Sequence, residues 1–285
     1  MRFGINTFLF ASPFTNASTR LFRRFKDWGF DSVEIAVEDL AHIDSNYVKS
    51  QLDRYGLVCG SATPCLGFDN DLRGTLQQQR AGVRFMKRVL DQMVVLECPT
   101  LMGVVYSTVG RADAVPRNEY RQQWKTVTKN LRDVCSYASD LGKCIALEPL
   151  NRFETDFINT CDQGLALIHS VGSPVLKLHL DTFHMNIEEK NSAAAIRRAG
   201  RHLGHFHACG CDRGTPGKDH IDWLGIAAAL KEIEYRGDVV IESFTSDVKA
   251  IARAASIWRK IEPTRAEIAT EGLRFLKRVL CSSNK

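Results

Sequence analysis

Four ionisable residues stand at the ends of apolar, strand-like runs of the sequence. They are Glu148, Asp181, His207 and Glu242. A carboxylate in such a position loses its hydration at a cost of several kcal/mol unless a cation or a metal ion compensates its charge. Three oxygen donors and one imidazole suit Mn²⁺, Mg²⁺ or Co²⁺, whereas structural zinc sites favour Cys and His ligands. The four residues are therefore a candidate site for one divalent metal ion, which could act as a Lewis acid on a substrate.

Eight short apolar runs with strand-like composition recur along the chain, and longer segments with helical spacing separate them. The runs are Phe3–Phe10, Ser32–Val37, Leu57–Ala62, Thr100–Tyr106, Cys144–Leu150, Val175–Leu180, Leu203–Ala208 and Asp238–Phe244. Eight such units predict an α/β fold, a (β/α)8 TIM barrel formed by one domain over residues 1–285. Active sites of such barrels lie at the carboxyl ends of the strands, so the four residues should converge at one mouth.

A doubly wound sheet is the main alternative to the barrel. That fold normally carries a Gly-rich phosphate-binding turn after its first strand, but here the first run is followed by Ala11-Ser12-Pro13-Phe14. The sequence also contains no Walker A motif. Both observations favour the barrel.

Composition excludes several classes of protein. The 285 residues include 38 Lys and Arg against 33 Asp and Glu, and this mild excess is not gathered into the stripes typical of nucleic-acid binders. No apolar run approaches the ~18 residues of a membrane span, and the first residues do not resemble a signal peptide. Nine scattered cysteines in a chain of this length indicate reduced thiols. We therefore expect a cytoplasmic protein that binds neither nucleic acid nor membrane.

On two of the runs we must predict which way the histidine side chains face. On Leu203–Ala208 we expect His207, nearer the carboxyl end, to face the barrel interior and His205 to pack behind the strand. His179 is expected to be a core histidine whose hydrogen bonds are satisfied.

Three more polar residues follow the predicted metal ligands along the chain. Glu154 and His184 come shortly after two of them, and Arg213 lies in a loop that contains Gly and Pro. Loops at this end of a barrel commonly contact the substrate, so Glu154, His184 and Arg213 are candidate substrate-binding residues.

Several segments resemble one family of sugar enzymes. They are Glu148–Glu154 (EPLNRFE), Asp181–Asn186 (DTFHMN), His207-Ala208 with Arg213 and Gly217, and Ile241-Glu242. They resemble the D-tagatose/D-allulose 3-epimerase and L-ribulose 3-epimerase group of the xylose-isomerase-like TIM barrels. The resemblance extends over the whole chain in length and element order.

The resemblance implies a set of roles. Glu148, Asp181, His207 and Glu242 would bind a divalent ion, typically Mn²⁺, and Glu154, His184 and Arg213 would bind ketose hydroxyls near C1–C3. The far end of the sugar would lie against the first four strands, which here offer Asn6, Phe8, Ala62, Pro64, Cys65 and Tyr106. Relatives are commonly homo-oligomers, dimers or tetramers.

The chemistry of a ketose 3-epimerase matches this residue set. Removing the proton from a carbinol carbon beside a ketone requires stabilisation of an enediolate, and inversion requires acid–base groups on both faces of that carbon. Glu148 and Glu242, on the fifth and eighth runs, are the predicted catalytic pair.

Other functions remain open. The same site could serve the metal-bearing barrel subunit of an enzyme that cleaves C-glycosides of 3-oxo sugars, with His184 as the base, or an inositol or hydroxypyruvate isomerase or dehydratase. An apurinic endonuclease would need further histidine ligands on the second to fourth runs, where only His42 is near. A non-catalytic sugar-binding barrel gives no reason for the acidic residues at equivalent strand ends.

Overall fold

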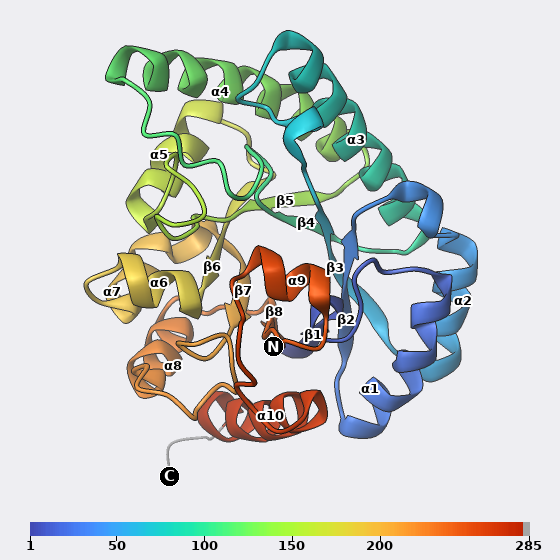
Figure 1. Cartoon of the computed structure of the whole chain (residues 1–285). Coiled ribbons are helices and arrows are strands. Elements are labelled where there is room, and N and C mark those ends of the chain that lie inside the picture. The colour runs from blue at the N-terminus through green and yellow to red at the C-terminus, as the bar shows by residue number, and fades with distance from the viewer. Residues whose placement is uncertain (282–285) are drawn as a thin grey trace.

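The computed structural model describes residues 1–281, and eight parallel strands close into a barrel within them (Figure 1). The strands are β1 (Arg2–Asn6), β2 (Ser32–Val37), β3 (Val58–Pro64), β4 (Thr100–Gly103), β5 (Cys144–Leu147), β6 (Leu176–Asp181), β7 (Leu203–Ala208) and β8 (Asp238–Ile241). β1 pairs with β8 from Arg2 opposite Asp238 to Ile5 opposite Ile241, which closes the ring. The predicted (β/α)8 TIM barrel is confirmed. The last four residues of the predicted domain, 282–285, lie outside the described residues.

Helices surround the barrel (Figure 1). They are α1 (Phe22–Trp28), α2 (Ser45–Tyr55), α3 (Leu76–Val95), α4 (Arg117–Asp140), α5 (Cys161–Val171), α6 (Thr182–Glu188), α7 (Ser192–Ala199), α8 (Trp223–Glu232), α9 (Lys249–Ala254) and α10 (Arg265–Cys281). Local chemistry sets many of their ends. The Asp44 side chain caps the first turn of α2, and Gly56, in a left-handed conformation, ends that helix.

Several strands end earlier than the apolar runs do. β1 stops at Asn6 because the Asn6 side chain accepts a hydrogen bond from the Phe8 backbone and starts a 3-10 turn, η1 (Thr7–Leu9). β4 stops at Gly103, whose φ of +108° lies outside the range of a strand. The chain therefore turns into loops at the mouth, where the side chains beyond each strand can meet.

The strands are buried on both faces, as expected for a parallel sheet covered by helices. All six residues of β2 are buried, including the ionisable Glu34. The outer faces pack against the helices in one large hydrophobic core. A separate small cluster of Phe244, Ala252 and Ile257 fixes α9 over the mouth.

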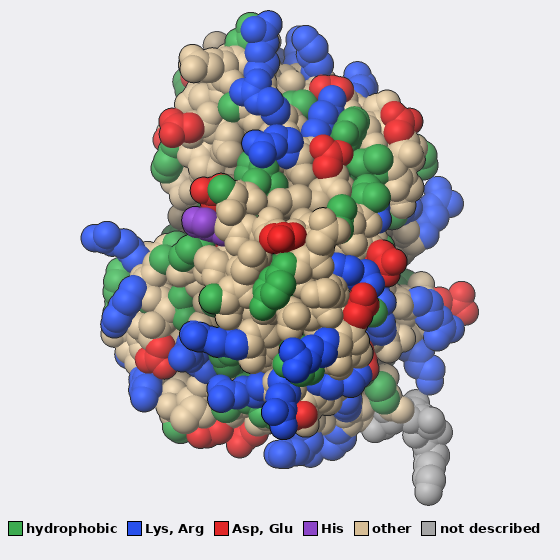
Figure 2. All heavy atoms as spheres, turned by 90° about the vertical axis from the view of Figure 1, so that its right-hand side faces the viewer, with side chains coloured by type: hydrophobic (Ala, Val, Ile, Leu, Met, Phe, Trp, Pro, Cys, Tyr) green, Lys and Arg blue, Asp and Glu red, His purple; other side chains and the backbone are tan. Residues whose placement is uncertain are grey.

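The surface carries most of the charge. On the face shown in Figure 2, Lys and Arg side chains are densest in the lower part, with Asp and Glu side chains among them. No helix in the described residues is long and apolar enough to cross a membrane. All nine cysteines are free thiols.

Candidate active site

The four predicted metal ligands meet at the carboxyl ends of four neighbouring strands. Asp181 ends β6, His207 lies near the end of β7, and Glu148 and Glu242 directly follow β5 and β8. One donor atom from each lies within 4.8 Å of the others. All four side chains are buried, with residue exposures of 0–9%. The structure thus brings together the whole predicted set as a buried candidate metal-binding cluster.

The polar atoms of this cluster that lack a hydrogen-bond partner fit a divalent cation. Glu148 Oε1 and His207 Nδ1 are buried, and neither has a hydrogen-bond partner. His207 Nε2 lies 2.8 Å from Glu34 Oε1. Because an ionised carboxylate only accepts hydrogen bonds, that contact places the lone pair of the neutral His207 ring on Nδ1. A cation with oxygen and imidazole ligands would satisfy both unpartnered atoms.

Burial and mutual repulsion make the carboxylates of the cluster costly to ionise. Burial and the nearby Glu242 raise the pKa of Glu148 well above its ordinary value. Burial also raises the pKa of Asp181, although the guanidinium of Arg213 acts in the opposite direction. A bound divalent ion would favour the ionised forms.

Among the described residues that line this cavity, Arg213 is the only Lys or Arg. Its Nη1 donates hydrogen bonds to Asp181 Oδ2 at 2.7 Å and to Glu242 Oε2 at 3.1 Å. The guanidinium lies between the rings of Phe183 and Phe244, 4.0 and 4.6 Å from their centroids. The charge is thus held in one position beside the acidic cluster.

His184 and Glu154 also reach the cavity. The Asn151 backbone N–H donates to His184 Nδ1 at 3.0 Å, and Arg213 Nη2 lies 3.0 Å from His184 Nε2. That Nε2 lies 3.7 Å from Glu148 Oε1. Burial, with Arg213 and His207 nearby, lowers the pKa of His184 well below its ordinary value. The Asn151 amide also donates to Glu154 Oε1 at 2.8 Å. One residue therefore orients both predicted substrate contacts.

The cavity at the mouth has a volume of about 270 Å³. Opposite the acidic cluster its wall is mainly apolar, with Phe8, Pro64, Cys65 and Ile251 among the lining residues. Of the residues of the first four strands expected at the far end of the sugar, Phe8, Pro64 and Cys65 line this cavity. Asn6, Ala62 and Tyr106 are buried and are not among its lining residues.

Similarity to known proteins agrees with this site. Residues 22–279 match the sequence family described as Xylose isomerase-like TIM barrel. The chain is 35% identical to a probable ketose 3-epimerase of Synechocystis sp., over 97% of this chain and 96% of that protein. It is 34% identical to an L-ribulose 3-epimerase of Methylomonas sp., over 87% of both. The chain belongs to the ketose 3-epimerase group of this family.

Solved structures of the ketose 3-epimerase group superpose closely on this barrel. A D-allulose 3-epimerase from Methylomonas sp., crystallised in complex with D-allulose, gives a TM-score of 0.92 at 30% identity and covers 98% of this chain and 97% of that chain. A D-psicose 3-epimerase crystallised in the presence of D-fructose also gives 0.92, at 28% identity, over 99% of this chain and 100% of that chain. Membership of this group confirms the predicted isomerase class.

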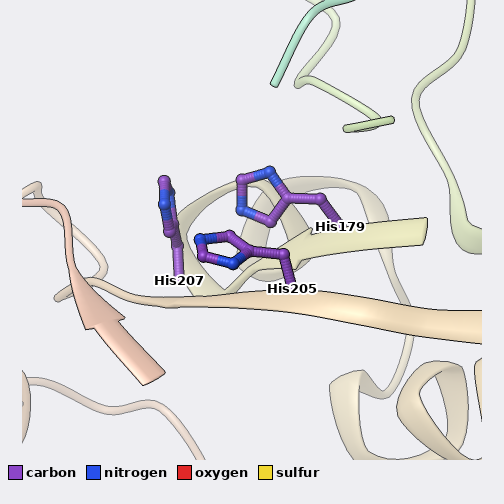
Figure 3. Close-up of side chains that lie close together, drawn as sticks. All are labelled: His179, His205 and His207. Atoms are coloured by element: carbon purple, nitrogen blue, oxygen red, sulfur yellow. The ribbon is translucent and has the colours of Figure 1, made fainter. Parts of the chain in front are cut away.

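Two predictions about histidines in this ketose 3-epimerase barrel are wrong. His205 does not pack behind β7 but lies inside the barrel, 2.7 Å from Glu34 Oε2, because residues two apart on a strand share a face. His179 is buried as expected, yet neither of its ring nitrogens has a hydrogen-bond partner. Figure 3 shows the rings of His179, His205 and His207 gathered together.

Three polar residues beside the epimerase-group site were not predicted in their observed roles. Glu34 contacts His207, Asn6 contacts Glu242, and Asn151 contacts His184. A signal for Glu34 was present, since it is an ionisable residue in the middle of the apolar run Ser32–Val37. Its partners lie on other strands, so the run itself does not identify them.

Proposed function

We propose that this protein epimerises free ketoses at C3 with the aid of a divalent metal ion, Mn²⁺ before Mg²⁺ or Co²⁺. Glu148, Asp181, His207 and Glu242 would hold the ion. The substrates would be of the D-tagatose, D-allulose, D-fructose or L-ribulose type. Family membership and the buried donor set support this reaction class.

The observation that carries the proposal is the pair of carboxylates Glu148 and Glu242. Both line the same cavity and follow β5 and β8, which are separated by β6 and β7 in the ring. Inversion of a carbinol carbon requires that one group removes a proton from one face while another delivers a proton to the opposite face. An isomerase that moves its proton with one base has no need of such a pair.

The steps follow from these side chains. When bound, the divalent ion would supply Lewis-acid stabilisation of the negative charge that develops on the sugar oxygens. Glu148 takes the proton from C3, the electrons of the broken C–H bond form the enediolate, and Glu242 delivers a proton to the other face of C3. In the reverse direction the two carboxyl groups exchange roles.

The other predicted residues bind and orient the sugar. Arg213 donates hydrogen bonds to hydroxyl or carbonyl oxygens, the His184 ring forms a hydrogen bond with a hydroxyl, and Glu154 accepts a hydrogen bond from a hydroxyl. Phe244 and the residues of α9 that line the cavity, such as Ile251, exclude water from the reacting carbon.

The charges around the cavity support an unphosphorylated substrate. Within residues 1–281, Arg213 is the only Lys or Arg that lines the cavity, and it already pairs with Asp181 and Glu242. Glu38 and Glu154 add further negative charge to the wall. A phosphate group would meet repulsion here and no free cation.

Solvent deuterium tests the proposal. The purified protein, loaded with Mn²⁺, is incubated in D₂O with D-fructose, D-allulose, D-tagatose or L-ribulose, and C3 is followed by NMR and mass spectrometry. Because one carboxylate removes the proton and the other delivers a proton, deuterium should appear at C3 of the product epimer before it appears in the residual substrate. Glu148→Gln and Glu242→Gln are each expected to reduce turnover by about 10³-fold or more.

Absence of both epimer and deuterium for every ketose would contradict the proposal and favour the C-glycoside-cleaving alternative.

A further inference from the structure

We propose that Glu34 is a positioning residue that fixes the tautomer of His207 and the orientation of Glu242 for binding the metal ion. This inference rests on the proposed metal-dependent function, but it concerns residues outside the four predicted ligands. Glu34 lies in the middle of β2, on the opposite side of the barrel ring from β6 and β7, and is fully buried.

Each oxygen of the Glu34 carboxylate has two polar partners. Oε1 lies 2.8 Å from His207 Nε2 and accepts from Asn6 Nδ2 at 2.6 Å. Oε2 lies 2.7 Å from His205 Nε2 and accepts from Ser61 Oγ at 2.5 Å. Four donors around one buried carboxylate stabilise its ionised form, which accepts hydrogen bonds and donates none.

This arrangement determines the protonation of His207. Because Glu34 Oε1 is an acceptor, the neutral ring of His207 carries its proton on Nε2 and its lone pair on Nδ1. Nδ1 has no hydrogen-bond partner and lies 3.3 Å from Glu242 Oε2, on the side of the acidic cluster. A carboxylate that binds the outer nitrogen of a ligand histidine sets both the tautomer and the basicity of the ligand nitrogen.

Asn6 connects Glu34 to Glu242 and fixes the orientation of the Glu242 side chain. Its Oδ1 accepts the Phe8 backbone N–H at 2.7 Å, so its amide nitrogen must point the other way. That nitrogen donates to both Glu34 Oε1 and Glu242 Oε1, at 2.6 and 2.9 Å. Glu242 therefore turns its Oε2 towards Arg213 and the acidic cluster.

Figure 3 shows the rings of His179, His205 and His207 close together, and two of them, His205 and His207, contact Glu34. The ring centroid of His207 lies 4.1 Å from that of His179 and 5.1 Å from that of His205. One ring nitrogen of each histidine also lies close enough to the others for the three to form a metal site. We assign His205 and His207 Nε2 to Glu34 instead, because both nitrogens are within 2.8 Å of its oxygens.

Two substitutions of Glu34 distinguish the effect of the His207 tautomer from the effect of the lost negative charge. In Glu34→Met the acceptor at His207 Nε2 is lost, so the ring proton moves to Nδ1 beside Glu242 and must be displaced before a metal ion binds. In Glu34→Gln the amide oxygen should face Asn6 and His207, because Asn6 Nδ2 is a donor, and the amide nitrogen should face His205. His205, and not His207, would then reverse its tautomer.

The test measures Mn²⁺ affinity by isothermal titration calorimetry and histidine tautomers by long-range ¹H–¹⁵N NMR of the metal-free full chain. Glu34→Met should weaken Mn²⁺ binding by about 10- to 100-fold, and Glu34→Gln by less. The matched control is Asp238→Asn. Asp238 is a buried carboxylate at the start of β8 that accepts hydrogen bonds from Arg2 and Ser32, so the control should lower thermal stability without changing Mn²⁺ affinity.

Several results would overturn the inference. These are unchanged Mn²⁺ affinity in Glu34→Met, an equal loss of affinity in Asp238→Asn, a neutral His207 ring with its proton on Nδ1 in the unaltered protein, or two bound ions per chain. If Glu34→Met does not fold, the NMR spectra of the unaltered protein and of Glu34→Gln decide the question. Mn²⁺ binding that depends on Glu34, in a protein that epimerises no ketose, would overturn the proposed function and leave this inference standing.

Discussion

At the mouth of this barrel, a single buried residue can compensate the charge of its ionised neighbours. Arg213 is the clearest case, because its buried guanidinium bonds to both Asp181 and Glu242 while its backbone adopts a φ of +66°. A residue other than Gly seldom adopts that conformation, so the contacts of the side chain must hold the loop in place. Arg213 thus serves stability as well as substrate binding.

Substitution of Arg213 should therefore affect stability in a way that depends on metal. Arg213→Ala leaves Asp181 and Glu242 without their cation and should reduce the free energy of unfolding by about 3–5 kcal/mol in metal-free protein. The loss should be smaller with saturating Mn²⁺, since the ion compensates the same carboxylates. Urea unfolding followed by circular dichroism, with chelator and with Mn²⁺, measures both values.

Arg259→Ala is the matched control for this substitution. Arg259 is an exposed arginine that contacts Asp212 at 3.5 Å, beside the same loop, and its removal should change stability by less than about 0.5 kcal/mol. Equal losses for Arg213→Ala with and without metal would contradict the charge-compensation argument.

Cysteine reactivity gives a second prediction at this scale. Burial raises the pKa of Cys135 and of Cys161 to about 12, whereas Cys281 is exposed. Only a thiolate reacts with iodoacetamide, and at pH 8 a thiol of pKa 12 is about one part in 10⁴ thiolate. Peptide mapping after brief treatment at pH 8 should find Cys281 alkylated first. Labelling of Cys135 at the same rate would mean that its helix opens readily.

Among the elements, β2 and α9 show how a segment can serve the site without supplying a predicted ligand. β2 carries Glu34 into the interior, and α9 covers the mouth with Ile251. α9 contacts the rest of the chain through a small apolar cluster, whereas α10 buries Ile268, Leu273 and Leu276 in the main core. Opening of α9 should therefore cost less free energy than opening of α10.

Hydrogen–deuterium exchange tests this difference between the two helices. Peptides covering Lys249–Ala254 should exchange faster than those covering Arg265–Cys281 in the metal-free protein. Addition of Mn²⁺ with a ketose should slow exchange in the first segment and leave the second unchanged. Equally slow exchange in both would show that α9 is a fixed wall of the cavity.

For the molecule as a whole, three buried carboxylates at one end of the barrel link metal binding to folding. A metal ion bound only by the folded state at 100 times its Kd stabilises that state by about 2.7 kcal/mol. For a domain of this size that corresponds to a rise in Tm of about 4–5 °C.

Differential scanning calorimetry with EDTA and then with excess Mn²⁺ measures this rise. In Asp181→Asn, which removes a donor from the cluster, most of the rise in Tm with Mn²⁺ should be lost. A Tm that is the same with EDTA and with Mn²⁺ would contradict a metal site in the cluster.

The sequence by itself determined the barrel and the positions of the four predicted ligands. Both depend on short-range information, because a buried parallel strand is a continuous apolar run and the polar residue that ends it lies at the mouth. Glu148, Asp181, His207 and Glu242 could therefore be found without knowing which strands face each other.

Only the tertiary structure decided which side chains meet across the barrel. Glu34 on β2 reaches His205 and His207 on β7, and Asn6 on β1 links it to Glu242. These contacts depend on the stagger of the closed ring and on which face of each strand points inward, and neither is encoded in any one run of residues. The physical reason is that apolar patterning specifies where a strand is buried, whereas polar partners across an interior are specified only once the barrel has closed.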